Sequence, residues 1–382
     1  MVRIPDFKLA AFFAALSVCG LAGTQLWAES AGELQHNLDL IQQVGKEGQG
    51  HTAAVQALKM VGQSGPQELP AILASMKDDN PLADNWVRGA VDAIAERALA
   101  SGTPLPLVEL EAFIADHGHS PRSRRLAFEW LAKADESLSQ SWIPKLLNDP
   151  SLELRREAVD DQLKKATAAK EAANTEEAIR RFRTALNFAR NVDQIDAATA
   201  PLRELGEEVD LPAHFGFITE WNLIGPFDNT DKSGFDRAFP PESKISLDAT
   251  LVGKEGEVDW EVASTQDQYG LLDLNAALGK HKGSVAYAYT EFYSDQDRPV
   301  DLRLGCINAN KIWLNGKLLT ANHVYHAGRG IDQYVGKGQL KQGKNSILLK
   351  ICQNEQEESW AQDWGFQLRV CDDLGTAVHS TE

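Results

Sequence analysis

The stretch VDLPAHFGFITEWNLIG, residues 209–225, divides the chain into two halves of different pattern. Before it, over residues 34–205, apolar residues recur at intervals of three and four, the spacing of amphipathic helices. After it, the helical period disappears, and aromatic and β-branched residues stand in short runs between turn signals. The sequence therefore predicts a multidomain protein, α then β, with a helical region over residues 33–209 and a β region over residues 214–373.

Length and charge limit the function classes. At 382 residues the chain is long enough that two folded units are favoured over one. Acidic residues outnumber basic ones by 55 to 38, and the formal net charge is −17. Such a charge repels phosphate backbones and anionic lipid headgroups. Nucleic acid is therefore not an expected partner, and no membrane contact is expected beyond an N-terminal anchor.

Residues 1–28 have the pattern of an export signal: a basic start, an apolar run and then small residues, with cleavage expected near Ala22 or Ala28. The apolar run of residues 9–23 is shorter than the about 20 residues that a membrane-spanning helix needs. We therefore expect an exported protein, periplasmic or extracellular. Two alternatives stay open: an uncleaved membrane anchor, and a lipoprotein with its lipid on Cys19.

The helical half contains a repeat. Four segments place a small residue inside an apolar face, at Ala54, Ala90, Ala127 and Ala158. Their spacings are 36, 37 and 31 residues, and in the last three an arginine stands two residues before the alanine: Arg88, Arg125 and Arg156. This pattern resembles HEAT repeats. The resemblance implies an α-solenoid, in which stacked helix pairs bury a shared core and offer a surface to a protein partner.

The last helix pair of this half differs from the others. Residues 174–189, NTEEAIRRFRTALNFA, and residues 195–206, IDAATAPLRELG, look like a tetratricopeptide pair that begins at an N-cap, Asn174 or Thr175. One such pair is too short to form a multi-repeat peptide groove. We expect it to end the helical repeats and to lead into the β half.

The β half is expected to form an antiparallel β-sandwich or jelly roll, because several short strands follow one another without intervening helices. The expected strands are residues 217–225, 285–294, 300–307, the hairpin 311–319, 345–352 and 365–372. In the hairpin KIWLNGKLL, Asn315 and Gly316 supply the two positive-φ positions of a type I′ turn. Ile312 and Leu314 share one face, and Trp313 takes the other, where a core position is favoured over a role as a stacking platform.

Seven segments of this half occur in a fixed order between residues 221 and 370: WNLIGPFDN, GFDRAFPPE, LLDLN, AYAYTEFYS, KIWLNGKLL, KNSILLK and WGFQLRV. Together they resemble the galactose-binding-like β-sandwich modules of exported planctomycete-type bacterial proteins, which often follow HEAT-like repeats. The resemblance implies a jelly roll and a binding role, commonly for carbohydrate, and no reaction. Many related modules carry an acidic SDDG-like loop before the hairpin. This chain has Asn308, Ala309 and Asn310 there, so no calcium or sugar contact is carried over to that loop.

Two loops combine aromatic with polar residues: NHVYHAGRGIDQY, residues 322–334, and EQEESWAQDWG, residues 355–365. A sugar presents an apolar face that stacks on an aromatic ring and hydroxyl groups that need polar partners. We therefore predict a carbohydrate site formed by Tyr325, His326, Asp332, Trp360 and Asp363, with further contacts from His323, Arg329, Gln362 and Trp364. The alternative is that both are ordinary variable loops.

The sequence carries no catalytic signature, since GxSxG, GxxxxGK[ST], GxGxxG, HExxH and CxxC are all missing from it. We expect a non-enzymatic protein without cofactor or metal, and interpret Asp116, His117 and His119 in DHGHSP as a helix break. Two functions stay open: a carbohydrate-binding module carried on helical repeats, and a protein-interaction scaffold that binds no small ligand. A third, a glycosidase with two carboxylates in a cleft, has no visible motif.

Three cysteines follow the export signal, and all lie in the β half: Cys306, Cys352 and Cys371. An odd number excludes complete internal pairing. Each stands in an apolar run, which favours buried thiols. One disulfide, between Cys352 and Cys371, stays open.

Overall fold

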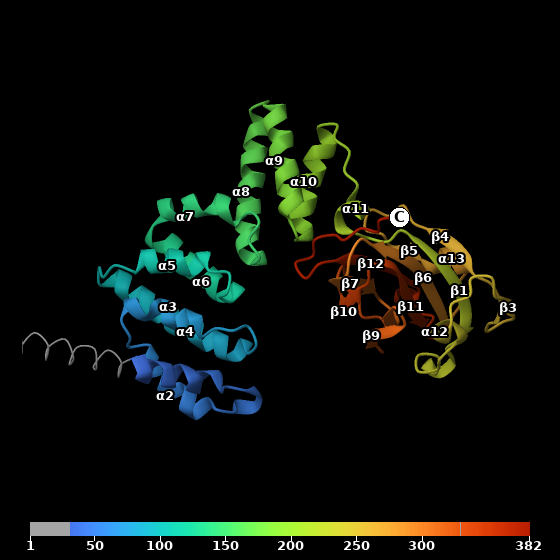
Figure 1. The fold of residues 1–382 in the computed structure, drawn as a ribbon, viewed down its shortest axis with the longest axis horizontal. Coiled ribbons are helices and arrows are strands. Elements are labelled where there is room, and N and C mark those ends of the chain that lie inside the picture. The colour runs from blue at the N-terminus through green and yellow to red at the C-terminus, as the bar shows by residue number, and fades with distance from the viewer. Residues whose placement is uncertain (1–30, 329) are drawn as a thin grey trace, which may run out of the picture. The chain divides into compact units, whose positions relative to one another are not determined.

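The structure is a computed structural model that describes residues 31–328 and 330–382. The chain divides into two compact units that meet between Pro201 and Leu202, inside helix α10 (Val192–Glu204). The first unit is helical and the second is built on antiparallel sheets (Figure 1), which confirms the predicted order, α then β. The predicted export signal, including Cys19, lies outside the described residues.

The first unit consists of helices joined by short turns. They are a helix whose described part covers residues 31–42, α2 (His51–Val61), α3 (Leu69–Ala74), α4 (Pro81–Ala100), α5 (Leu107–Ala115), α6 (Pro121–Ala134), α7 (Glu136–Trp142), α8 (Leu152–Glu171), α9 (Thr175–Phe188) and α10. Five of these described helices begin with a cap, in which a side-chain oxygen accepts a hydrogen bond from a backbone N–H of the first turn. The capping residues are Asn80, Ser120, Asp135, Ser151 and Asn174. These caps satisfy N–H groups that have no partner inside the helix.

The repeated segments of the sequence lie on α2, α4, α6 and α8, and their four alanines are buried. Each arginine that precedes one of these alanines pairs with a carboxylate further along the series: Arg88 with Glu129 at 2.6 Å, Arg125 with Glu157 at 2.7 Å, and Arg156 with Asp193 at 2.5 Å. These pairs connect α4 to α6, α6 to α8, and α8 to α10. The repeated pattern therefore marks contacts between successive helices.

The second unit contains two main sheets. Its strands are β1 (Glu220–Asp228), β2 (Leu251–Val252), β3 (Glu257–Val258), β4 (Glu261–Ser264), β5 (Leu272–Asp273), β6 (Ser284–Ser294), β7 (Arg298–Cys306), β8 (Ala309–Leu314), β9 (Lys317–Asn322), β10 (Tyr334–Leu340), β11 (Gly343–Gln353) and β12 (Gly365–Cys371). The orders are β4-β1-β6-β11-β8-β9 and β10-β7-β12-β5, antiparallel throughout, with β2 and β3 paired separately. Short helices α11 (Leu211–Phe215), α12 (Pro240–Ser243) and α13 (Leu274–Leu278) complete the unit.

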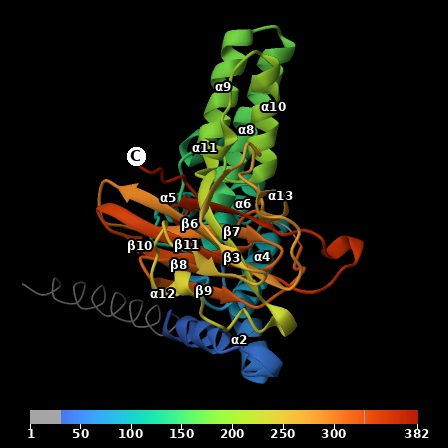
Figure 2. The ribbon, with the colours of Figure 1, turned by 90° about the vertical axis from the view of Figure 1, so that its right-hand side faces the viewer.

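Alternate residues of β6 define the two faces of the six-stranded sheet, whose strands β6, β11 and β8 run side by side (Figure 2). Ala286 and Ala288 belong to a buried cluster that also contains residues of β7 and β12, so the two sheets pack face to face. Tyr287 and Tyr289 point to the other face, where a second cluster is covered by residues 235–260. Both faces of this sheet are therefore buried.

The hairpin has the predicted geometry. Asn315 and Gly316 have φ values of 52° and 76°. Ile312 and Leu314 lie in the cluster between the sheets, and Trp313, 8% exposed, lies in the outer cluster. Trp313 is therefore a core residue, as predicted. Strand β10 was not predicted, because the glycines in YVGKGQL interrupt its alternation.

Cys306, Cys352 and Cys371 are buried and form no disulfide with one another, so the alternative of a Cys352–Cys371 disulfide is not realised. Cys352 lies on β11, in the outer cluster of the six-stranded sheet, whereas Cys371 lies on β12 in the other sheet. Packed sheets are about 10 Å apart. A disulfide needs Cα atoms within about 7 Å of each other, which explains why the two thiols do not pair.

Candidate functional site

One end of the six-stranded sheet gathers the loops that carry the predicted site. The strand register pairs the residues at this end: Asp228 with Ser284, Ser284 with Gln353, Cys352 with Ala309, and Asn310 with Asn322. The turn after β1, the loop after β9 (residues 323–333) and the loop after β11 (residues 354–364) therefore leave the sheet side by side.

A chain of aromatic rings lies across these loops. The Trp360 side chain is 58% exposed, and its ring stands nearly perpendicular to that of His326, with centroids 4.9 Å apart. His323 contacts Tyr325 at 5.6 Å and stacks on Phe235 at 4.2 Å. Tyr325 packs against the outer cluster of the sheet. The rings thus lead from the core to an exposed indole.

The Tyr325 hydroxyl is held by a buried amide. Asn229, which is fully buried, donates from Nδ2 to Tyr325 Oη at 3.2 Å and to the carbonyl of Gln353 at 2.8 Å. Burial raises the pKa of Tyr325 to about 12. The hydroxyl therefore keeps its proton and can donate it to another acceptor.

The contacts of Asn354 determine the tautomer of His326. Asn354 Oδ1 accepts from the backbone N–H of Gln356, and Asn354 Nδ2 donates to Gln356 Oε1. Asn354 Oδ1 also lies 3.1 Å from His326 Nε2. Because an amide oxygen can only accept, Nε2 carries the proton of this hydrogen bond. In the described part of the chain, His326 Nδ1, Asn229 Oδ1 and Gln353 Oε1 are buried and have no hydrogen-bond partner. Three buried acceptor atoms at this end of the sheet thus have remaining hydrogen-bonding capacity.

An open hollow adjoins the rings. Its lining residues are Lys232, Asn354, Glu355, Gln356, Glu357 and Glu358. Lys232 Nζ also lies 5.5 Å from the centre of the Tyr325 ring. The hollow therefore presents an ammonium group, amides and carboxylates next to exposed aromatic surface, a combination suited to non-covalent binding of a polyhydroxylated ligand.

The structure brings together Tyr325, His326 and Trp360, and places Asp363 in the same loop as Trp360 with its main-chain carbonyl bonded to Asn308. His323 is exposed beside Tyr325, whereas two other predicted contacts are not available to a ligand in the same way. Trp364 is 1% exposed and belongs to the core. The Gln362 amide donates to the carbonyls of two residues of its own loop. Arg329 lies outside the described residues.

Asp332 does not belong to this group. Its carboxylate accepts hydrogen bonds from Arg369, at 2.6 and 2.5 Å, and from Arg303 at 3.1 Å. These arginines alternate with the core residues of β12 and β7, so they lie on the outer face of the four-stranded sheet. Tyr325 packs on the outer face of the other sheet, which means that Asp332 and Tyr325 lie on opposite sides of the pair of sheets.

Residues 308–310, just before the hairpin, have a structural role in this chain. Asn308 and Asn310 are fully buried. Asn308 Oδ1 accepts from the backbone N–H of Gly365 at 3.3 Å, and Asn310 Oδ1 accepts from Asn322 at 2.9 Å. The asparagines join strand ends and do not face a ligand.

Sequence reasoning missed Asn229, Lys232 and Asn354. Asn229 and Lys232 follow the first predicted strand, and Asn354 follows the strand predicted over residues 345–352. Their positions soon after predicted strands are the one feature of the sequence that could have indicated them as loop residues of the site. Which strands are neighbours depends on a sheet order that the sequence pattern does not specify.

The described residues also show what the molecule offers to a metal ion or a membrane. Over residues 31–328 and 330–382, no group of three or more His, Cys, Asp or Glu is placed to hold a metal ion. Within the same ranges, no helix combines the length and apolar character needed to cross a membrane. In the DHGHSP turn, His119 stacks on Phe113 at 3.8 Å and lies 3.6 Å from Asp116.

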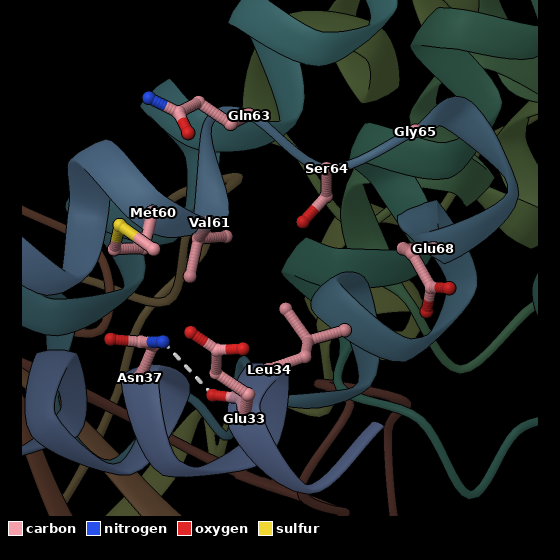
Figure 3. Close-up of a pocket in the computed structure, with 9 residues that line it drawn as sticks. All are labelled: Glu33, Leu34, Asn37, Met60, Val61, Gln63, Ser64, Gly65 and Glu68. Atoms are coloured by element: carbon pink, nitrogen blue, oxygen red, sulfur yellow. Dashed lines mark hydrogen bonds between the residues drawn. The ribbon is translucent and has the colours of Figure 1, made fainter. Parts of the chain in front are cut away.

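A second hollow lies on the helical unit (Figure 3). Its lining comes from the first helix, the C-terminal end of α2 and the turn that follows: Glu33, Leu34, Asn37, Met60, Val61, Gln63, Ser64, Gly65 and Glu68. Asn37 donates to the main-chain carbonyl of Glu33 at 2.9 Å. The hollow lacks the exposed aromatic ring of the other site, and we assign it no function.

No protein-family profile matches this chain, and no curated protein matches it. Among solved structures, it is similar to a family 35 carbohydrate-binding module from Clostridium thermocellum, with 13% identity, a TM-score of 0.18, and coverage of 23% of this chain and 71% of that one. A β-glucosidase from Kluyveromyces marxianus in complex with glucose has 15% identity and a TM-score of 0.24 over 45% of this chain. The match spans 21% of the β-glucosidase. At these TM-scores the similarity assigns no function to this chain.

Proposed function

We propose that this chain is an exported, non-catalytic protein that binds carbohydrate through the aromatic end of its C-terminal unit. We propose further that this unit is a jelly-roll β-sandwich, and that the helical unit is a HEAT-like α-solenoid ending in a tetratricopeptide-like pair. The shared core of the two sheets supports the sandwich. The recurrent buried alanines and the arginine pairs between successive helices support the solenoid.

The observation that carries the binding function is the exposed Trp360 ring beside His326 and a hollow lined with polar groups. An indole exposes a large apolar surface that a pyranose ring can cover, and burying it removes that surface from water. Carboxylate, amide and ammonium groups around the hollow match hydroxyl groups, which both donate and accept hydrogen bonds.

The test uses the full chain on a glycan array, followed by calorimetric titration with the glycans that bind. Trp360→Ala should cost about 1 kcal/mol or more of stacking energy, which weakens binding about fivefold or more. Val262→Ala is the control, because Val262 is 69% exposed and lies on β4, at the opposite edge of the sheet from β9. Unchanged affinity of Trp360→Ala would place the site elsewhere, and a wild type that binds no glycan would favour the protein-interaction scaffold.

The proposed export is tested by sequencing the N-terminus of the native protein. A mature chain that begins after Ala22 or Ala28 is the expected result. An intact Met1 in the cytosolic fraction would refute export, and a lipid on Cys19 would favour the lipoprotein alternative.

A further inference from the structure

We infer that Asp332 is a positioning residue, which holds the loop of residues 323–333 so that Tyr325 and His326 are presented to the ligand. The inference rests on the proposed function, and replaces the prediction that Asp332 contacts the ligand. It follows from the place of Asp332 in the loop, from the rigidity of its partners and from the contacts of the residue that follows it.

Asp332 stands at the end of the loop, two residues before β10, in a left-handed conformation with φ of 61°. Both carboxylate oxygens accept from Arg369, and one of them also accepts from Arg303. Paired, charge-assisted hydrogen bonds of this kind fix orientation as well as position. The C-terminal end of the loop is therefore attached at a defined point of the four-stranded sheet.

The two arginines are themselves held in place. Arg369 is 4% exposed and donates to the carbonyls of Phe215 and Gly375. Arg303 donates to Asp301 and to the carbonyl of Asp373. The anchor of the loop thus also holds the end of α11 and the turn after β12, and has little freedom to move.

Gln333 carries this restraint to the aromatic residues. Its Nε2 donates to the carbonyls of Ala327 and Gly328, and its Oε1 accepts from the backbone N–H of Cys306 on β7. Ala327 in turn donates to the carbonyl of Ile307 at 3.3 Å. Ala327 directly follows His326, so a loop released at its end would lose the contacts that fix the His326 backbone.

The test compares wild type, Asp332→Asn and Arg303→Gln as full chains. Asp295→Asn, an exposed carboxylate in the turn between β6 and β7, is the charge-matched control. Binding is measured by calorimetric titration with a glycan that the wild type binds, and the loop is followed by hydrogen exchange of the amides of residues 323–328. Circular dichroism confirms that each variant is folded.

We expect Asp332→Asn to accelerate hydrogen exchange in the loop and to weaken binding about tenfold. A tenfold loss of affinity is expected if about a tenth of the molecules keep the loop in the conformation that binds. Arg303→Gln should act in the same direction, and the double variant should fall short of the product of the two effects, because both changes act on one ion pair. Asp295→Asn should change neither readout.

Two results would overturn the inference: unchanged binding by Asp332→Asn, or weakened binding with unchanged loop exchange, which would indicate direct contact with the ligand. A wild type that binds no glycan removes the proposed function and this inference together. That outcome is recognised before any variant is made. It is therefore distinct from the failure of the inference alone.

Discussion

Arg124 and Asp149 form a buried ion pair that joins the start of α6 to the turn before α8. Two parallel hydrogen bonds connect them, at 2.7 and 2.6 Å, and the residues are only 1% and 4% exposed. Asp149 also accepts from the backbone N–H of Ser151, and its carbonyl accepts from Arg155 Nε at 2.9 Å. The carboxylate and the main-chain carbonyl of Asp149 thus connect the NDPS turn to Arg124 and Arg155.

Asp149→Ala should destabilise the helical unit by about 3–5 kcal/mol, because the change leaves the Arg124 guanidinium buried without its counter-charge. Urea unfolding followed by circular dichroism at 222 nm measures the cost. Glu129→Ala is the matched control. Glu129 pairs with Arg88 and Arg125 at partly exposed positions, so the loss should be at most about 1 kcal/mol. Equal losses of unfolding free energy in the two variants would show that burial does not increase the contribution of the Arg124–Asp149 pair.

The repeated sequence pattern did not predict this ion pair. The repeated pattern marked Arg125 and Arg156, whose pairs with the next helices are partly exposed. The residues before them, Arg124 and Arg155, are the buried ones. Neighbouring residues on a helix point in different directions, so periodicity places both near the interface. The path of the NDPS turn brings Arg124 and Arg155, and not Arg125 and Arg156, to Asp149.

Lys350→Met should destabilise the β unit by about 3 kcal/mol or more. Lys350 is fully buried, and its Nζ donates to Glu242 at 2.7 Å and to the carbonyls of Phe235 and Arg237. Burial lowers the pKa of Lys350, although its hydrogen bond to Glu242 opposes the shift. The lysine holds residues 235–242 over the sheet. Its loss removes the donor to two carbonyls and the counter-charge of the Glu242 carboxylate, which still accepts from Tyr287.

The measurement is thermal unfolding followed by near-ultraviolet circular dichroism. Lys344→Met serves as control, because Lys344 is 56% exposed in its pair with Glu291 and should contribute less than about 1 kcal/mol. Adding Glu242→Gln to Lys350→Met should restore part of the loss. A fully stable Lys350→Met variant would show that the buried ammonium group is dispensable.

The three cysteines should resist alkylation in the folded protein. Burial raises the pKa of Cys352 to about 12 and that of Cys371 to about 11, and the thiolate is the form that reacts. At pH 8, iodoacetamide should label Cys306, Cys352 and Cys371 only after unfolding in guanidinium chloride. Peptide mass spectrometry without reduction is the readout, and a crosslinked Cys352–Cys371 peptide would contradict the free thiols.

The β half shows why a site is harder to predict from sequence than a fold. The alternation of Ile312, Trp313 and Leu314 fixed the two faces of β8 correctly, because side-chain direction is a local property of a strand. The structure separates Asp332 from Tyr325, because the loop after β9 crosses from one sheet to the other. Tyr325 remains near the first sheet and Asp332 reaches the second. Residues that are close in sequence therefore lie on opposite sides of the pair of sheets.

Acid should weaken the contribution of Asp332 to stability. Burial acts to raise the pKa of this carboxyl group, but the hydrogen bonds and charges of Arg369 and Arg303 outweigh it, so the pKa lies below its usual value. A depressed folded-state pKa means that the stabilisation is fully present above the unfolded value of about 3.9 and is lost as the pH falls through the folded pKa.

At pH 7, Asp332→Asn should therefore cost about 1.5–3 kcal/mol of unfolding free energy, the range for hydrogen bonds to charged groups. Urea unfolding of wild type and Asp332→Asn at pH 7 and pH 3 measures the difference, which should shrink at the lower pH. Other carboxylates titrate equally in both proteins and cancel, so a difference that stays constant would mean that the Asp332 charge does not stabilise the fold.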